Sequence, residues 1–146
     1  WDAELITDAC AVLQNLAGAS REVKLLLASS RATRLWIALL VGTRPGTAAA
    51  VATLRLLASL VTDDGEVKTR MGAADGFFES LEQRLLSVLE EFGIDGSSGE
   101  PAGILGLLCR LTARHEDNKR RCLRARDTVS LAVEMCVAEE APASTR

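Results

Sequence analysis

Apolar residues recur along the chain at the three- and four-residue steps of an amphipathic helix, and glycine, proline and short polar runs separate these stretches. The first stretch, residues 3–17, predicts a helix with one apolar face toward the core. That face is formed by Leu5, Ala9, Val12 and Leu16, with Ile6 and Leu13 beside them. Gly18 follows, and because glycine is typical of the position after a helix, we expect the helix to end there.

Eight further helical segments follow in the same way. They are a short helix after Ser20 and the ranges 31–41, 46–61, 66–71, 76–92, 101–114, 117–124 and 127–138. The stretch GIDGSSGEP, residues 93–101, is the one segment whose composition predicts a loop, and Pro101 suits the first turn of the next helix. In the range 31–41, Leu35, Trp36, Leu39 and Leu40 share an apolar face, so we expect Trp36 in the core. Leu and Ala dominate and aromatic residues make up only 3%, which favours an all-α fold of closely packed helices.

One junction between a long and a short helix occurs three times. After Leu16, Leu60 and Leu111 the chain reads AGASREVK, VTDDGEVK and TARHEDNK, with an acid six residues and a lysine eight residues after each leucine. The leucines stand 44 and 51 residues apart, and the loop and longer helix before the third junction account for the difference. Periods of about 40 to 47 residues with two or three helices are typical of α-solenoids, in which neighbouring units cover one another's apolar faces.

These junctions resemble the armadillo repeat family, in which a long third helix ends in an N-L-A-like segment and a short first helix begins with an E-N-K-like segment. LQNLAGASREVKLLL, LASLVTDDGEVKTRM and LCRLTARHEDNKRRC match that junction in order and spacing. The resemblance implies a right-handed α-solenoid of about three three-helix repeats over residues 1–146, read as third, first and second helix. Because it starts out of phase and lacks an initiator Met, we expect a fragment of a longer chain. A HEAT-like solenoid is the nearest alternative, and a non-repeat helical bundle the next.

The resemblance also implies a non-enzymatic protein-binding scaffold. In armadillo proteins the third helices line a concave groove, where an Asn on each can hold the backbone of an extended peptide. Only Asn15 occupies that place here, since Ser59 and Arg110 stand at the matching positions, so the resemblance does not extend to importin-like recognition of basic peptides. It is closer to divergent members of the ataxin-10 and rotatin type, which are associated with centrioles and cilia.

We therefore expect a protein partner, an acidic or amphipathic segment, along the surface formed by helices 3–17, 46–61 and 101–114. Arginine side chains there would select acidic groups. The expected partner-facing residues are Gln14, Asn15, Arg55, Ser59, Arg110 and Arg114.

The distribution of charge along the chain indicates an alternative function. The net charge of −3 and pI near 5.2 argue against non-specific nucleic-acid binding by the whole domain. The stretch KRRCLRAR, residues 119–126, is the local exception, and it allows phosphate or nucleic-acid binding. Lys119, Arg120, Arg121 and Arg124 would carry that function. On a helix here, Cys122 and Leu123 are expected to face inward, which would leave the charges as a solvated face.

The remaining chemistry predicts no enzyme, metal site or cofactor. Four cysteines stand in apolar helical stretches without a C-x-x-C pair, so we expect buried free thiols and a reducing compartment, the cytosol or nucleus. His115 is the only histidine, without triad or metal-ligand spacing around it, and we expect it at a helix end where the dipole favours a cation. No stretch approaches the ~18 to 20 apolar residues of a membrane span.

Overall fold

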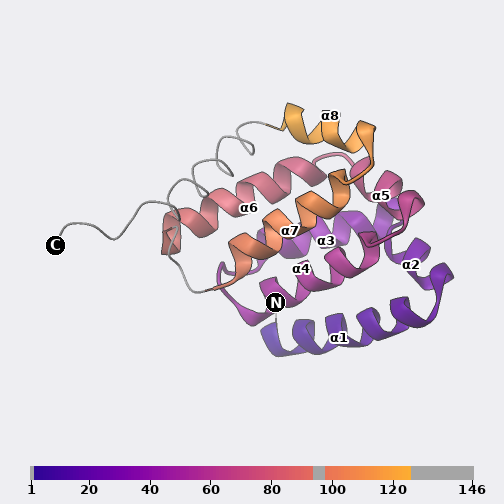
Figure 1. The fold of residues 1–146 in the computed structure, drawn as a ribbon. Coiled ribbons are helices and arrows are strands. Elements are labelled where there is room, and N and C mark those ends of the chain that lie inside the picture. The colour runs from indigo at the N-terminus through magenta and orange to yellow at the C-terminus, as the bar shows by residue number, and fades with distance from the viewer. Residues whose placement is uncertain (1, 94–97, 126–146) are drawn as a thin grey trace, which may run out of the picture.

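The computed structural model describes residues 2–93 and 98–125, and these contain eight α-helices and no strand (Figure 1). The helices are α1 (Ala3–Ala19), α2 (Arg21–Leu27), α3 (Ser30–Gly42), α4 (Ala48–Val61), α5 (Gly65–Gly72), α6 (Phe77–Phe92), α7 (Glu100–Thr112) and α8 (Glu116–Arg124). The all-α prediction is confirmed, and each predicted helix within the described residues is present. The predicted helix at 127–138 lies outside the described residues, as does Cys136.

Helices that occupy the same place in successive sequence repeats pack against one another. The long helices α1, α4 and α7 lie side by side, with α4 in the middle (Figure 1). α3 packs against α6, and the short helices contact in the order α2, α5 and α8. A single apolar core runs through all three sets. Trp36 lies in it as predicted, 4% exposed, and its indole Nε1 donates a hydrogen bond to the carbonyl of Leu27 at 2.8 Å.

The three repeated junctions share the way in which the short helix begins. Ser20, Asp64 and His115 each stand four residues after the repeated leucine, and each caps the N-terminus of the following short helix with its side chain. The acceptor distances are 3.4 Å from Ser20 Oγ to Val23 N, 3.1 Å from Asp64 Oδ1 to Val67 N, and 3.2 Å from His115 Nδ1 to Asn118 N. The sequence repeat is therefore also a repeat of the position at which the short helix begins.

Polar contacts join successive junctions. Arg21 binds Asp64 at 3.1 Å, 43 residues later, and the Lys68 ammonium donates to the carbonyl of Ala113 at 2.9 Å, 45 residues later. Burial alone would raise the pKa of Asp64, but hydrogen bonds from the Val67 N–H and the Arg21 guanidinium outweigh it and hold that pKa below its usual value. These contacts fix each short helix against the junction one repeat away.

His115 occupies the opposite helix end from the one predicted. It caps the N-terminus of α8, where the dipole disfavours a cation, and its ring acts there as an acceptor. With Nδ1 accepting from Asn118 N, the ring proton lies on Nε2, which donates to Thr69 Oγ1 at 2.9 Å. His115 therefore links α8 to α5.

We predict that His115→Ala destabilises the protein by about 1 to 2 kcal/mol, because the cap and the bond to Thr69 are both lost. His115→Asn should lose less, since asparagine caps helices well. Urea unfolding followed by circular dichroism measures both. Equal losses for the two variants would show that capping is not what His115 contributes.

Four details of the sequence reading are wrong. Gly18 does not end α1, which runs to Ala19 with Ser20 as its cap. Leu35 is 47% exposed rather than buried. Cys109 is an exposed thiol, not a buried one, whereas Cys10 is buried and burial raises its thiol pKa. Leu123 is 69% exposed and points outward.

The largest error concerns α1. The face predicted to meet the core, formed by Leu5, Ala9, Val12 and Leu16, is exposed. The adjacent side, with Ile6, Cys10 and Ala17 buried, packs on α4 instead. α1 is apolar on two sides, so the periodicity of its sequence did not show which side packs against α4.

Candidate functional site

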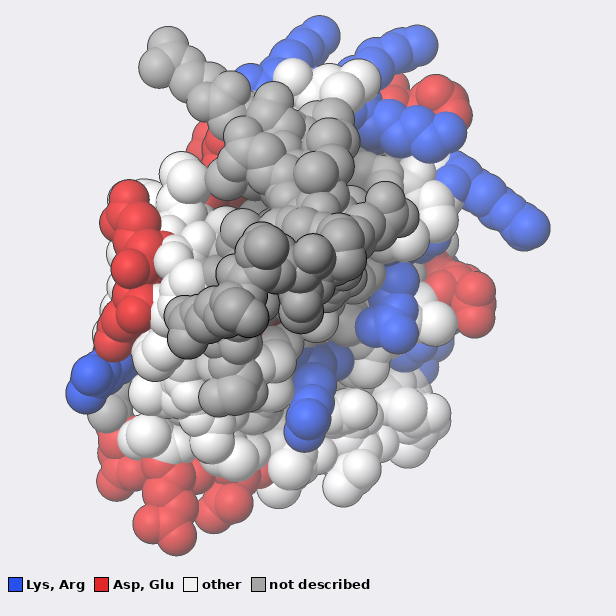
Figure 2. Space-filling view, turned by 60° about the vertical axis from the view of Figure 1, so that its left-hand side comes forward, with Lys and Arg blue, Asp and Glu red and all other residues white. Residues whose placement is uncertain are grey.

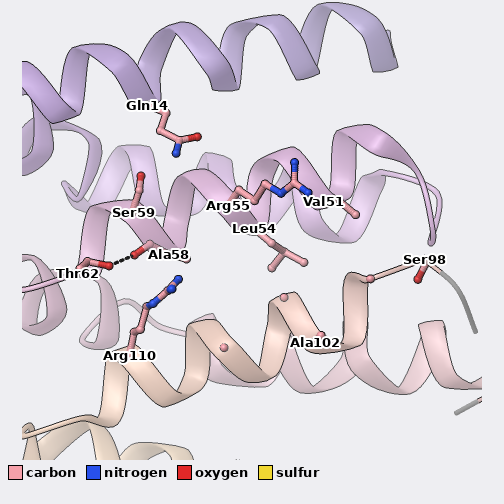
Figure 3. Close-up of a pocket in the computed structure, with 13 residues that line it drawn as sticks. Gln14, Val51, Leu54, Arg55, Ala58, Ser59, Thr62, Ser98, Ala102 and Arg110 are labelled. Atoms are coloured by element: carbon pink, nitrogen blue, oxygen red, sulfur yellow. Dashed lines mark hydrogen bonds between the residues drawn. The ribbon is translucent and has the colours of Figure 1, made fainter. Parts of the chain in front are cut away.

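A groove with a volume of about 550 Å³ lies along α4 and α7, with one side chain of α1 at its edge (Figure 3). We call it the central groove. Its lining residues are Gln14, Val51, Leu54, Arg55, Ala58, Ser59, Thr62, Ser98, Gly99, Ala102, Gly103, Gly106 and Arg110. Four of the predicted partner-facing residues are among them, namely Gln14, Arg55, Ser59 and Arg110.

The floor of the central groove is made largely of small residues. Ala58 on α4 and Ala102, Gly103 and Gly106 on α7 all line it. A Cβ added at Gly106 would meet no atom within 4 Å, so the space above this glycine is open. Small side chains let the backbone of an extended segment approach closely.

The rim of the central groove carries hydrogen-bond donors without partners among the described residues. Arg55 and Arg110 are exposed and form no ion pair with any residue that the structure describes. They come from successive long helices and both reach into the same space, Arg110 toward α4 (Figure 3). Two guanidinium groups over a floor of small residues favour carboxylate ligands, which accept paired N–H bonds from each group.

Two other polar residues line the central groove, Ser59 with a hydroxyl group and Gln14 with a side-chain amide. Ser59 Oγ donates to the carbonyl of Leu56 at 2.7 Å, so its oxygen can still accept from a ligand. Gln14 is exposed on α1 and points toward α4. These groups offer a ligand both hydrogen-bond donors and acceptors.

Two predicted residues lie elsewhere. Asn15 is exposed on α1 but does not line the central groove. Arg114 lies after the end of α7, in the connection to α8, with a left-handed backbone conformation at φ 56°. The predicted helix at 101–114 ends at Thr112, which moves Arg114 off the face of α7.

The basic stretch forms α8, whose cations project from the end of the molecule opposite α1 (Figures 1 and 2). Lys119 pairs with Glu116 at 2.5 Å, and Arg120 with Asp117 at 3.6 Å. The Lys119 ammonium holds the pKa of the Glu116 carboxyl below its usual value. Two of the four predicted cations are thus already next to carboxylates of their own helix. Arg121 and Arg124 line a hollow of about 200 Å³ with Asp75 and Glu79.

A buried ion pair supports the far end of the central groove, and sequence reasoning missed it. Arg84 of α6 and Glu100 at the start of α7 are 4% and 0% exposed, and Arg84 Nε donates to Glu100 Oε1. The other carboxylate oxygen accepts from the Gly46 N–H at 2.6 Å. Arg84 Nη1 also donates to the carbonyls of Leu40, at 2.8 Å, and Thr43. The pair joins the end of α3, the start of α7 and the body of α6.

A sequence signal for this pair exists. Arg84 stands among Phe77, Leu81 and Val88 at helical spacing, so a charge falls within an apolar stripe. A buried charge of this kind needs a partner of opposite sign. Only the fold shows that the partner is Glu100, from the next helix.

The described residues contain neither a membrane-spanning helix nor a cluster of metal ligands. No helix is by itself long and apolar enough to cross a membrane; α2 and α3 reach that length and composition only together, across a 63° bend. No three His, Cys, Asp or Glu side chains cluster as ligands of a metal ion would. In comparisons with known proteins, no family model, no curated protein and no solved structure matches this chain.

Proposed function

We propose that the chain is an armadillo-like solenoid segment that acts as a non-enzymatic binding module for an extended acidic protein segment in the central groove. The observation that carries the binding function is the pair Arg55 and Arg110. These side chains come from successive long helices, line one groove and have no acidic partner among the described residues.

The repeat organisation supports the solenoid part of the proposal. Helix caps recur at the same offset from three leucines, and helices of corresponding position pack on one another. Hydrogen bonds such as Arg21 to Asp64 and Lys68 to Ala113 join residues about one repeat apart. Stacked units of this kind place equivalent side chains in a row along one surface.

The groove's shape supports an extended ligand. Ala102, Gly103 and Gly106 leave room for a main chain, and Gln14 and Ser59 offer side-chain partners for its amide groups. Carboxylates of the ligand would then pair with the two arginines, which recognise a planar carboxylate with paired N–H groups. Exposed arginines contribute more to selectivity and association rate than to total affinity.

The test uses labelled peptides of about ten residues, one rich in Glu and Gly and one with Lys in place of each Glu, and fluorescence anisotropy as the readout. The wild-type chain should bind the acidic peptide more tightly than the basic one. The double variant Arg55→Glu with Arg110→Glu should weaken binding of the acidic peptide at least about tenfold. Pull-down with the same variant tests partners from cells.

A matched control has the same change of charge away from the groove. Arg31 and Arg34 are exposed on α3 and do not line the central groove. Arg31→Glu with Arg34→Glu should leave peptide affinity within about twofold once salt screens long-range charge. If this control weakens binding as much as the groove variant does, net charge rather than the groove determines binding and the proposal fails.

A second variant blocks the groove without changing charge. Because a Cβ at Gly106 meets open space, Gly106→Leu should fold normally and fill the floor of the groove. We predict that it weakens binding of the acidic peptide at least about tenfold while circular dichroism and the unfolding midpoint stay unchanged or rise. Unchanged peptide affinity in this folded variant would place the binding surface elsewhere.

A further inference from the structure

A second, smaller hollow is lined by the end of α3, the turn that follows it and the middle of α6. We call it the α3–α6 hollow. Its volume is about 160 Å³, and it shares no lining residue with the central groove. A cavity of about this volume holds one benzene-sized molecule, so the α3–α6 hollow has room for a ligand of about six to eight non-hydrogen atoms.

Arg84 lines this hollow and has a donor group without a partner. Of the five N–H groups of its guanidinium, three are used: Nε donates to Glu100, and Nη1 donates to the carbonyls of Leu40 and Thr43. The other two belong to Nη2, which is buried and has no hydrogen-bond partner among the described residues. Because the planar guanidinium is held at both other nitrogens, Nη2 cannot turn toward a different acceptor. An acceptor supplied from outside the chain would therefore stabilise this group.

The balance of charge favours an uncharged acceptor. Arg84 is the one charged residue among the described residues that line the hollow. Its charge is already compensated by the buried carboxylate of Glu100. A carboxylate or phosphate ligand would place a second negative charge beside this pair and would lose its own hydration. A carbonyl oxygen accepts the same N–H groups without bringing a further charge into the site.

The other walls of the hollow match an amide with a short alkyl group. Leu40, Val41 and Pro45 form an apolar side, and Val41 is 57% exposed. On α6, Ser87 Oγ donates to a carbonyl of its own helix at 3.0 Å, so its oxygen can still accept from a ligand N–H. A secondary amide therefore has a group for each wall: a carbonyl for Arg84, an N–H for Ser87 and an alkyl group for the apolar side.

We propose that the α3–α6 hollow binds a small uncharged secondary amide with a short branched alkyl group, whose carbonyl oxygen accepts hydrogen bonds from Arg84 Nη2. The ligand contacts α3 and α6 together, so it stabilises the folded chain when it binds. This site is independent of the central groove, because the two have no lining residue in common.

NMR titration of the whole chain tests the site, with N-isopropylacetamide as the probe and isovalerate as a charged probe of similar size. The amide should shift the methyl signals of Leu40 and Val41 and the guanidinium signals of Arg84 in a saturable way. A dissociation constant of the order of millimolar is expected for so small a ligand. Isovalerate should bind at least about fivefold more weakly, because it brings a charge to the buried pair.

A variant that fills the hollow leaves the bonds of Arg84 in place. Ser87 Oγ donates within its own helix, so Ser87→Met should fold normally, and its longer side chain should occupy the hollow. We expect amide binding at least about fivefold weaker, with an unchanged circular dichroism spectrum. Ser59→Met is the matched control, because Ser59 Oγ also donates within its own helix but lines the central groove. This control should leave amide binding unchanged.

Three results would overturn the proposal. The absence of a saturable shift up to about 100 mM amide would leave Nη2 to an ordered water molecule. Tighter binding of isovalerate would show that the site takes an anion, and unchanged amide binding by the folded Ser87→Met variant would place the binding elsewhere. A peptide with an acetylated N-terminal alanine carries the same amide group as the probe. Tighter binding of this peptide than of the free amide would indicate a chain end as the natural source of the group, and weaker binding a free small molecule.

Discussion

Glu100→Ala should destabilise the protein by about 3 to 5 kcal/mol, the cost of leaving a buried charge without its partner. Arg84 is 4% exposed, and Glu100 is the one carboxylate that the described residues place against it. Removing Glu100 also deprives the Gly46 N–H of its acceptor. Urea unfolding measures the loss, followed by circular dichroism and by fluorescence of the buried Trp36.

Further variants separate the charge from the hydrogen bonds. Glu100→Gln keeps an acceptor for the Gly46 N–H but removes the charge. Its free energy of unfolding should therefore lie between that of wild type and that of Glu100→Ala. Arg84→Met with Glu100→Leu removes both charges, and it should cost less than the sum of the two single replacements because neither charge is left alone. Additive costs in this double-mutant cycle would show that Arg84 and Glu100 do not act as a pair.

An exposed pair between neighbouring elements provides the control. Arg44, just after α3, reaches Glu91 of α6 at 3.3 Å, but the two side chains are 79% and 35% exposed. Solvent screens such a pair, so Arg44→Ala should change stability by less than about 0.5 kcal/mol. A loss as large as that of Glu100→Ala would mean that burial is not the reason for the greater effect.

The helices themselves could be predicted from the sequence because their signals are local. Ser20 and Asp64 stand where caps are expected, and Pro101 lies in the first turn of α7 as predicted. Gly18 misled the prediction of a helix end because a glycine in a helix costs only about 1 kcal/mol, less than the packing and the Ser20 cap contribute.

The features that could not be predicted from the sequence depend on contacts between residues that are far apart in the chain. α1 has two apolar sides, and only the position of α4 decides that Ile6 and Cys10 are covered while Leu5 and Val12 are not. The partnership of Arg84 with Glu100 likewise depends on how α6 and α7 meet. Four of the predicted residues line the central groove, and of these only Ser59 and Arg110 stand at equivalent repeat positions. Arg114 does not line it, because α7 ends two residues before it.

Gly72→Ala should destabilise the protein by about 2 to 4 kcal/mol, because Gly72 lies where α5 contacts α8. A Cβ at Gly72 would lie 2.0 Å from Asn118 Oδ1 and 2.5 Å from its Cγ. Asn118 cannot turn away freely, because it is 0% exposed and its Nδ2 donates to the carbonyls of Lys68 at 3.0 Å and Leu111 at 3.1 Å. The added methyl group must therefore either break these bonds or separate the two helices.

Gly65→Ala in the same helix is the matched control. A Cβ at Gly65 meets no atom within 4 Å, so this variant should be neutral or slightly more stable. Urea unfolding of the two variants side by side distinguishes the clash at Gly72 from a general effect of replacing glycine in α5.

The chain itself suggests the rescue. At the preceding junction the positions equivalent to Gly72 and Asn118 hold Ala28 and Val67, both 0% exposed. Gly72→Ala with Asn118→Val transfers that pair to the α5–α8 contact and removes the amide with which the methyl group clashes. We expect the double variant to recover more than half of the stability lost in Gly72→Ala, because equivalent positions of successive repeats should accept the same pair. If the double variant is less stable than Gly72→Ala, then the hydrogen bonds of Asn118 contribute more than the relief of the clash, and the two junctions are alike in backbone but not in packing.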